Sequence, residues 1–294
     1  MKNAKVYCFG EVLFDVYKTT KLPGGAPMNV ALHLLKQGKE SSLISKVGDD
    51  KNGLELMEFI KDRGGSTDLI QRSSTYETGT VNVKISDKGN ASYIINAPVA
   101  WDFIDFDASL EKRVTPLDFL VYGSLAVRNQ HSFETLHNLL DLDVQKVFDV
   151  NLREPYYTDS KIELLIEKTD ILKLNEDELD ILHMKYAPET SGLESFTNFL
   201  LHRFKLKGVL VTMGEHGALA NFNYRIYKTE GVKVEVKDTV GSGDSFLAAF
   251  ISKYIDGIDI EQCLSYGCAT GAFVAKCSGA NPEYEISDIH NLIS

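Results

Sequence analysis

Short apolar strands alternate with helical segments along most of this 294-residue chain, and this alternation restricts the fold more than any other feature. The strands are mainly apolar runs without a polar face, which is typical of strands buried on both sides. We predict them at residues 6–9, 42–47, 118–122, 146–150, 170–174 and 208–212, with helices near 30–37, 53–63, 132–140 and 246–254. This order favours an α/β fold in which helices flank a central, mostly parallel sheet.

Residues 76–101 interrupt the alternation. Apolar and polar residues alternate with period two over 80–85 and 91–95, and the turn-forming residues Asp87-Lys88-Gly89-Asn90 separate the two runs. The pattern predicts an antiparallel hairpin outside the main sheet. Such a hairpin can cover a cleft as a lid or pair with another subunit.

Residues 237–246 bring two glycines and a carboxylate to the start of a helix. A predicted strand near 227–236, carried by alternate valines, leads into Asp238-Thr239-Val240-Gly241-Ser242-Gly243-Asp244. The glycines let a ligand approach the backbone, and the free N–H groups of a helix start favour a phosphate or a developing anion. Asp244 is then either a helix cap or a base that takes a proton from a nucleophile aimed at that phosphate.

Other polar positions also stand next to predicted helices or strand ends. Gly24 and Gly25 precede a helix, and the amide of Asn29 suits a polyhydroxy ligand because it both donates and accepts. Arg153 follows a strand at the edge where α/β sheets bind ligands, and either neutralises a phosphate or pairs with a surface acid. The acids in 175–178 either satisfy a helix dipole or hold Mg²⁺ around phosphates together with Asn175.

Composition excludes several classes of protein. The net charge of −11 and the isoelectric point near 5.2 argue against a nucleic-acid groove, which needs clustered Lys and Arg. No apolar stretch approaches the roughly 20 residues of a membrane span, and the first residues contain no apolar signal-peptide region. The cysteines have no metal-ligand spacing and are expected to be reduced (Cys8, Cys263, Cys268 and Cys277). We therefore predict a cytoplasmic protein that binds neither nucleic acid nor membrane.

Several common catalytic motifs are missing from the sequence. It contains no G-x-x-x-x-G-K-[ST] loop, no G-x-G-x-x-G after the first strand and no G-x-S-x-G elbow. The histidines show no zinc-ligand spacing either. These absences argue against a Walker-type NTPase, a Rossmann dehydrogenase and an α/β-hydrolase.

Five motifs in register resemble those of the PfkB (ribokinase-like) carbohydrate kinases. Gly24-Gly25-Ala26-Pro27-Met28-Asn29-Val30-Ala31 is similar to the first family signature, and residues 238–244 are similar to the second, with Ser242 where the family more often has Ala. The other motifs are 45–50 with Gly53, the N-x-x-E of 175–178, and 212–214. Within the family, Gly10-Glu11 with Asp15, the Gly-Gly-Ala-Pro loop, 123–126 and 149–153 are most similar to fructokinases.

The resemblance implies a ribokinase-like fold with an α/β core and a small β-strand lid. The core would comprise residues 1–12, 23–75 and 102–294, and the lid residues 13–22 and 76–101. The resemblance also implies transfer of the γ-phosphoryl group of ATP to a hydroxyl of a monosaccharide, most closely fructose, with Mg²⁺ as cofactor.

The resemblance further implies a role for each matching residue. The sugar would be held by Asp15, Gly24, Gly25 and Asn29. Asp244 would be the general base, the N–H groups of Gly241, Ser242 and Gly243 would form the anion hole, and Arg153 would lie near the transferred phosphoryl group. Asn175 and Glu178 would organise Mg²⁺ and phosphates through water, and the nucleotide site would be lined by Thr212, Gly214 and Gly217. Asp238 and Val240, with carbonyls around Gly279, match part of a site for a monovalent cation such as K⁺.

Other functions stay open at this point. 2-Keto-3-deoxygluconate kinases share several of the motifs, and a nucleoside kinase of the same family is compatible with Tyr93 and Trp101. A non-catalytic sugar or nucleotide sensor on the same fold is a hypothesis of another class. We also hypothesise a homodimer formed through the lid strands.

Overall fold

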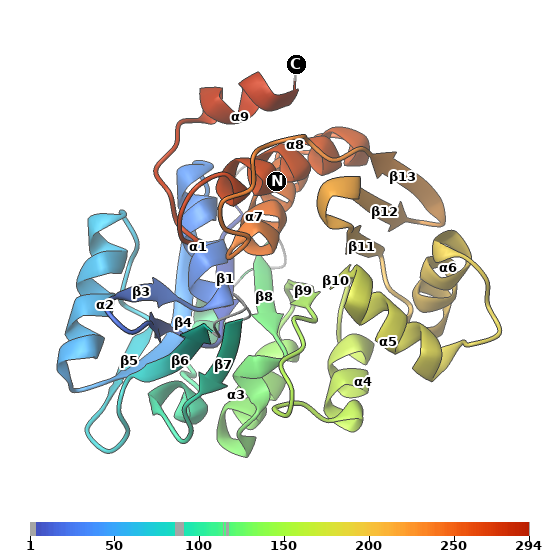
Figure 1. Cartoon of the computed structure of the whole chain (residues 1–294). Helices are drawn as coiled ribbons and strands as arrows, with labels where there is room; N and C mark the ends of the chain where they lie inside the picture. Colours follow the sequence, from blue (N-terminus) through green and yellow to red (C-terminus); the bar gives the residue numbers. More distant parts are fainter. Residues whose placement is uncertain (1–3, 86–90, 114, 116–117, 294) are drawn as a thin grey trace.

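A central sheet forms the frame of the molecule (Figure 1). The computed structural model describes residues 4–85, 91–113, 115 and 118–293. Within these residues the sheet is nine-stranded, in the order β13-β12-β11-β10-β9-β8-β1-β4-β5. Its strands are β1 (Val6–Phe9), β4 (Ser41–Gly48), β5 (Ile70–Ser73), β8 (Phe119–Gly123), β9 (Gln145–Asp149), β10 (Ile171–Asn175), β11 (Gly208–Thr212), β12 (Ala218–Phe222) and β13 (Arg225–Thr229). Neighbouring strands from β5 to β11 are parallel, and β12 and β13 are antiparallel additions at one edge, so the predicted mostly parallel sheet is confirmed.

Helices cover both faces of this sheet. One face packs against α1 (Ala26–Lys36), α2 (Lys51–Asp62), α7 (Ser242–Ile255) and α8 (Ile260–Ala275). The other packs against α3 (Gln130–Leu140), α4 (Asp159–Glu167), α5 (Glu176–Tyr186) and α6 (Leu193–Phe204). The last helix, α9 (Ile286–Ile293), packs on α8. The expected α/β architecture with helices on both faces is therefore present.

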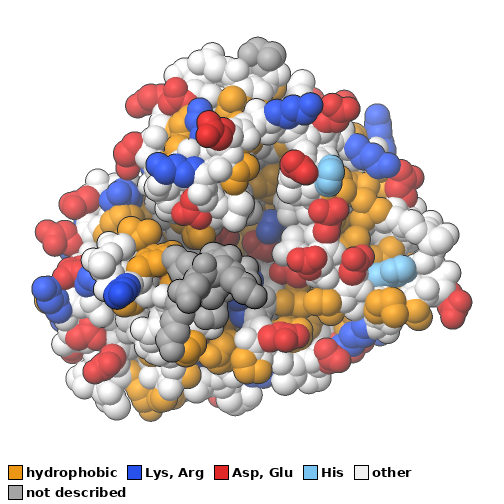
Figure 2. Space-filling view, viewed as in Figure 1, with side chains coloured by type: hydrophobic (Ala, Val, Ile, Leu, Met, Phe, Trp, Pro, Cys, Tyr) orange, Lys and Arg blue, Asp and Glu red, His pale blue; other side chains and the backbone are white. Residues whose placement is uncertain are grey.

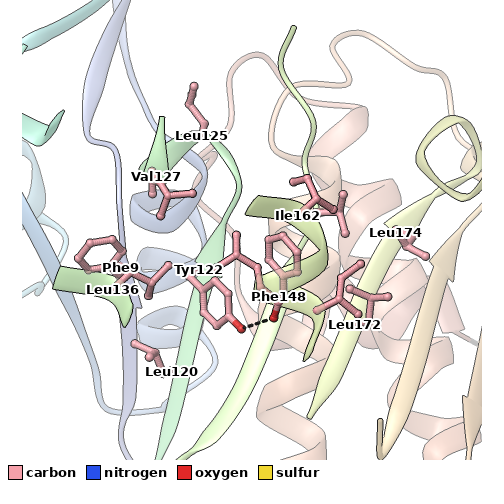
Figure 3. Close-up of a cluster of buried hydrophobic side chains, with 14 of the residues drawn as sticks. Phe9, Leu120, Tyr122, Leu125, Val127, Leu136, Phe148, Ile162, Leu172 and Leu174 are labelled. Atoms are coloured by element: carbon pink, nitrogen blue, oxygen red, sulfur yellow. Dashed lines mark hydrogen bonds between the residues drawn. The ribbon is translucent and has the colours of Figure 1, made fainter. Parts of the chain in front are cut away.

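The central strands are apolar throughout because both of their faces are buried. In β8, Leu120 and Tyr122 enter the core under α3 and α4, whereas Phe119 and Val121 enter the core under α1 and α7. Figure 3 shows the first of these clusters, in which Tyr122 lies beside Phe148 with ring centroids 5.2 Å apart. Each fully buried side chain of this size contributes about 1.5–3 kcal/mol of hydrophobic stabilisation, so the strands cannot shift by one residue without exposing a core face.

A second, smaller sheet lies beside the carboxyl edge of the first (Figure 1). It has the order β3-β2-β6-β7 and comprises β2 (Leu13–Val16), β3 (Lys21–Gly24), β6 (Gly79–Ile85) and β7 (Ala91–Ile95). β6 and β7 pair antiparallel, as the period-two pattern predicted, while the predicted turn at 87–90 lies outside the described residues. β2 joins β6 in parallel, so residues far apart in sequence build this sheet together. The use of this sheet as a lid, and the boundaries proposed for it, stay predictions.

The strand predicted near 227–236 is wrong over most of its length. β13 ends at Thr229, and residues 230–236 run without strand pairing into the turn before α7. Valines at every second position carry the period of a strand, but a strand also needs a neighbour to accept its hydrogen bonds. This segment leaves the sheet edge, and its next main-chain hydrogen bonds run from the N–H groups of Lys237 and Asp238 to Ala275 O in α8.

Two helices were not predicted from the sequence, α4 at residues 159–167 and α6 at residues 193–204. In α6 the signal was present, because Phe196, Leu200, Leu201 and Phe204 follow helical spacing and all four are buried. In α4, an exposed polar face leaves only Ile162, Leu165 and Ile166 in the core. Short helices of this kind are determined mainly by what they pack against.

A buried ion pair joins the second sheet to the core. Arg128 donates to Asp102 from Nε and Nη2 at 2.6 and 2.8 Å, and both side chains are almost completely buried. The guanidinium also donates to Asn96 O at 2.6 Å and lies 4.0 Å from the centre of the Trp101 ring. Because Asn96 follows β7, this pair anchors the end of the second sheet against the segment that follows β8.

We predict that Arg128→Met lowers the free energy of unfolding by about 3–5 kcal/mol, because the carboxylate of Asp102 is then buried without its partner. The measurement is urea denaturation followed by circular dichroism. Arg203→Met is the matched control, since Arg203 pairs with Glu163 at 3.2 Å on the surface. We expect the control to lose less than about 1 kcal/mol. Equal losses in the two variants would contradict a special role for the buried pair.

Candidate active site

The carboxyl ends of the parallel strands carry the polar residues of the site. Asp149 is the last residue of β9, and Asn175 and Thr212 end the neighbouring strands β10 and β11, where they are register partners. Figure 2 shows that this face of the molecule is hollowed at its centre, with charged side chains of both signs inside the hollow. The site therefore lies where open α/β sheets commonly bind ligands.

The first turn of α7 forms one wall of the site. Gly241 is the N-cap of α7 with φ 79°, and a Cβ at this residue would stand 2.6 Å from the Cβ of Ala280, so the turn requires glycine. Among the described residues, no acceptor bonds the N–H groups of Gly241, Gly243 and Asp244. The N–H of Ser242, by contrast, donates to Thr239 O at 3.2 Å. The turn thus leaves three N–H groups at the helix start ready for an anion, whereas the Ser242 N–H predicted for this role already has an acceptor.

Asp244 points its carboxylate at α1. Its Oδ2 accepts a hydrogen bond of 2.7 Å from Nδ2 of Asn29, and α7 has no side-chain cap, so the helix-cap alternative for Asp244 is wrong. Burial, together with the charge of Asp149, raises the pKa of Asp244 to about 6, against the lowering effects of the Asn29 bond, Lys173 and Arg153. A carboxylate with a pKa near 6 is ionised at neutral pH and basic enough to take a proton.

The residues predicted to bind sugar lie on the first strands of the second sheet and at the start of α1. Asp15 is in β2, and burial raises the pKa of its carboxyl to about 6. Gly24 lies against this carboxylate, because a Cβ there would stand 2.7 Å from Asp15 Oδ2. Gly25 has φ 116°, and its missing side chain leaves room for Glu11 O, which a Cβ would approach to 2.4 Å.

Arg153 connects these groups electrostatically. The side chain is exposed, and its charge lowers the pKa of Asp15, of Asp244 and of the buried Glu11. Burial raises the pKa of Glu11 to about 7, and its Oε2 has no hydrogen-bond partner in the described part of the chain. Arg153 is therefore close enough to act on carboxylates of β2, of the segment before β2 and of α7. Among the described residues it forms no ion pair, and its Nη1 donates to Leu152 O at 2.8 Å.

Asn175 and Glu178 form a capping box at the start of α5. Asn175 Oδ1 accepts from the N–H of Glu178 at 2.8 Å, and Glu178 Oε2 accepts from the N–H of Asn175 at 3.0 Å. Glu178 Oε1 also accepts from the N–H of Leu152 at 2.9 Å, and burial raises the pKa of this carboxyl. Each carboxylate oxygen keeps a further lone pair that a water can use, so the predicted contact with Mg²⁺ through water fits these residues. In the described residues, no group of three or more His, Cys, Asp or Glu side chains is arranged to hold a metal directly.

The predicted nucleotide-site residues follow β11. Thr212 bonds Leu174 O through Oγ1 at 3.3 Å, and Gly214, with φ 53°, borders open space. Gly217, with φ 91°, has no room for a Cβ, which would stand 2.0 Å from Thr229 O. These residues thus lie at the same sheet edge as Asn175, and their contact with a nucleotide stays a prediction.

Asp238 and Val240, predicted to take part in a cation site, lie in a hydrogen-bonded turn before α7. The carboxylate of Asp238 accepts from the N–H of Val240 and from the N–H of Gly279, both at 3.0 Å. This arrangement brings the three predicted cation-site residues together. The cation itself stays a prediction.

Lys173 is a site residue that was not predicted from the sequence. It is buried in β10, and its Nζ donates to both carboxylate oxygens of Asp149, at 2.8 and 3.0 Å. A Cβ at Gly243 would stand 3.4 Å from this Nζ, so the cation lies under the first turn of α7. Its sequence signal was a lysine inside an apolar strand, since lysines are almost never fully buried without a partner.

These features together are typical of an enzyme that transfers phosphoryl groups. A helix start that can hold an anion, a carboxylate in its first turn able to accept a proton, and a buried cation beneath that turn suit transfer of a phosphoryl group to a hydroxyl. The model of the pfkB family of carbohydrate kinases matches residues 2–286. The chain belongs to this family, and its predicted activity as an ATP-dependent carbohydrate kinase is confirmed at that level.

Several proteins that are similar to this chain in sequence or structure are named fructokinase. The chain is 28% identical to a probable chloroplastic fructokinase-6 of Arabidopsis thaliana, over 94% of this chain and 79% of that protein. It is 26% identical to fructokinase-2 of Solanum lycopersicum, over 94% and 92% of the two chains. A fructokinase of Vibrio cholerae O395 with bound fructose, ADP and calcium has the same fold, with a TM-score of 0.87 at 21% identity and full coverage of both chains. A fructokinase of Xylella fastidiosa with bound ATP gives a TM-score of 0.87 at 21% identity, over 99% and 98% of the two chains. The ribokinase-like fold expected from the sequence is therefore confirmed.

The two halves of the Lys173–Asp149 pair act on Asp244 with opposite sign, which gives a test. Asp149 raises the pKa of Asp244, and Lys173 lowers it. We predict that Asp149→Asn moves the acid limb of kcat/KM to lower pH and that Lys173→Met moves it to higher pH, each by roughly one unit. The measurement is the pH profile of sugar-dependent ADP release.

Lys207→Met is the matched control, because Lys207 forms an exposed pair with Asp170 at the opposite end of the same strands. We expect its profile to match that of the unmodified protein. Shifts of the same sign in the two active-site variants would contradict the assigned electrostatics.

Proposed function

We propose that this carbohydrate kinase phosphorylates fructose and uses Asp244 as general base. The observation that carries the proposal is the position of Asp244 in the first turn of a helix whose free N–H groups can hold an anion, with a pKa raised to about 6. Support for the sugar comes from relatives named fructokinase, which align over nearly the whole chain.

The proposed reaction assigns each step to residues of this chain. Asp244 accepts the proton of the attacking sugar hydroxyl, whose oxygen forms a bond to the γ-phosphorus of ATP as the bond to ADP breaks. The N–H groups at the start of α7, those of Gly241 and Gly243 among them, stabilise the charge on the transferring group. Arg153 adds a positive charge on the side of the sugar. Asp15, Gly24, Gly25 and Asn29 hold the sugar hydroxyls.

Mg²⁺ and a monovalent cation have proposed places in this scheme. When bound, Mg²⁺ neutralises phosphate charge, and Asn175 and Glu178 would hold it through water. Thr212, Gly214 and Gly217 would line the nucleotide site. Asp238 and Val240 would hold K⁺ or a similar ion beside the anion hole.

The second sheet is proposed as the lid that excludes water from the reaction. It carries Asp15, and its exposed side chains include Leu22, Tyr93 and Ile94, which supports the hypothesis of a homodimer through these strands. No helix in the described residues has the length and apolarity needed to cross a membrane. The cytoplasmic location stays a prediction.

We expect Asp244→Asn to lose roughly 10²–10⁴ in turnover, the typical contribution of a positioned base, while sugar and ATP binding change little. Because only the ionised carboxylate accepts a proton, kcat/KM of the unmodified enzyme should fall as the pH drops through about 6. Asp256→Asn is the control, since Asp256 lies at the far end of α7 in an exposed pair with Lys39. Turnover of Asp244→Asn within a few fold of the unmodified enzyme would overturn the assignment.

A panel of acceptors tests the proposed substrate. ADP release with ATP and Mg²⁺ is measured in turn for fructose, other hexoses, pentoses, 2-keto-3-deoxygluconate and nucleosides, and we expect the highest kcat/KM with fructose. A higher value with the sugar acid or a nucleoside would redirect the specificity within the family. Binding without ADP release from any acceptor would instead support the sensor hypothesis.

A further inference from the structure

One face of α1 is polar and faces the segment that precedes α9. Asn29, His33 and Lys36 are spaced by four and three residues, so they project from one side of the helix. His33 Nε2 bonds Ala280 O at 2.8 Å, and Lys36 Nζ donates to Pro282 O at 2.5 Å. This stripe therefore binds the backbone of residues 280–282.

The histidine in this stripe is neutral, because burial lowers its pKa to about 4. Its Nε2 must then carry the proton that is donated to Ala280 O, which leaves Nδ1 as the acceptor for the hydroxyl of Tyr284 at 3.0 Å. The segment is also held from α7's side, where the N–H of Gly279 donates to Asp238. Residues 279–284 are thus fixed on both sides at neutral pH.

This segment presents Asn281 to Asn29. Asn281 Nδ2 donates to Asn29 Oδ1 at 2.7 Å, and Asn29 Nδ2 donates to Asp244 Oδ2 at 2.7 Å. An ionised carboxylate only accepts hydrogen bonds, so Asn29 must turn its NH₂ group towards Asp244 and its oxygen towards Asn281. Asn281 in turn can only satisfy that oxygen as a donor. The three side chains therefore form a chain of hydrogen bonds with one direction.

We propose that Asn281 is a positioning residue that orients the base through Asn29; the proposal rests on the assignment of Asp244 as general base. Asn281 holds the amide plane of Asn29, and Asn29 holds Oδ2 of Asp244. Oδ1 of Asp244 has no hydrogen-bond partner in the described part of the chain, so this oxygen is left to receive the proton of the sugar hydroxyl.

The test combines two variants with a control on the same segment. In Asn281→Leu, Asn29 can rotate away from Asp244, and we expect kcat to fall about tenfold with KM for ATP unchanged. The acid limb of kcat/KM should move to higher pH, because the Asn29 bond lowers the pKa of Asp244. In Asn281→Asp the new carboxylate can only accept hydrogen bonds, so Asn29 must reverse its amide and turn its oxygen towards Asp244. We expect kcat to fall about a hundredfold and the acid limb of kcat/KM to move further to higher pH than in Asn281→Leu. Glu283→Gln, an exposed neighbour on the segment, should leave both quantities unchanged.

A double-mutant cycle distinguishes positioning from a general structural effect. If Asn281 acts through Asn29, Asn281→Leu should change neither kcat nor the acid limb further in an Asn29→Ala background. Additive losses, or a loss of thermal stability without a shift of the acid limb, would overturn the proposal.

A readout without turnover keeps this test separate from the proposed function. Carboxyl ¹³C NMR titration of Asp244 should show its pKa raised in Asn281→Leu relative to the unmodified protein. An unchanged pKa would contradict the proposal that Asn281 acts on Asp244 through Asn29. If the protein phosphorylated no sugar, the proposed function would be refuted. The NMR result would still decide whether Asn281 orients Asp244 through Asn29.

Discussion

The positive charge of Lys173 allows several carboxylates to share one edge of the sheet. Asp149, Glu178 and Asp244 all lie within its influence, and it lowers the pKa of Glu178 and Asp244 while it bonds Asp149 directly. Removing a lysine and an aspartate from water costs several kcal/mol per ion, so such a pair is weak evidence for stability alone. Its place under the first turn of α7 gives it an electrostatic use, because its positive charge opposes the negative charge that Asp149 adds beside Asp244.

The fold brings together residues that are distant along the chain. Asn29 begins α1, Asp244 begins α7, and Asn281 lies just before α9, yet two hydrogen bonds of 2.7 Å connect them. The parallel sheet makes this arrangement possible, since α1 and α7 pack side by side on the same face and start at the same edge. The second sheet then adds Asp15, which shares the electrostatic field of Arg153 with Asp244. The proposed base Asp244 thus lies in a helix, Asp15 in the second sheet and the Lys173 cation in the central sheet.

Predictions from the sequence succeeded where a residue's neighbours are local or its pattern is long. The strands β8, β10 and β11 were found because burial on both faces gives continuous apolar runs, and the hairpin β6–β7 was found because its residues alternate with period two. The strand predicted after β13 was wrong because its valines repeat with the period of a strand, although no neighbouring strand pairs with this segment. For Asp244 the local pattern allowed two interpretations, a helix cap or a base. Only the hydrogen bond from Asn29 and the absence of a side-chain cap on α7 excluded the helix cap. The Ser242 N–H shows the same limit, because its acceptor is set by the exact path of the turn.

The sequence by itself determined the α/β class, the glycine-rich start of α7 with Asp244, and the family to which the chain belongs. These follow from short-range rules: the period of burial, the conformations open to glycine, and motifs whose spacing survives in one dimension. Only the tertiary structure decided that Lys173 pairs with Asp149 beneath the first turn of α7, and that Asn281 reaches Asp244 through Asn29. Hydrogen bonds and desolvation act over a few ångströms of space, whatever the separation along the chain, so these contacts exist only once the sheet has brought its carboxyl ends together.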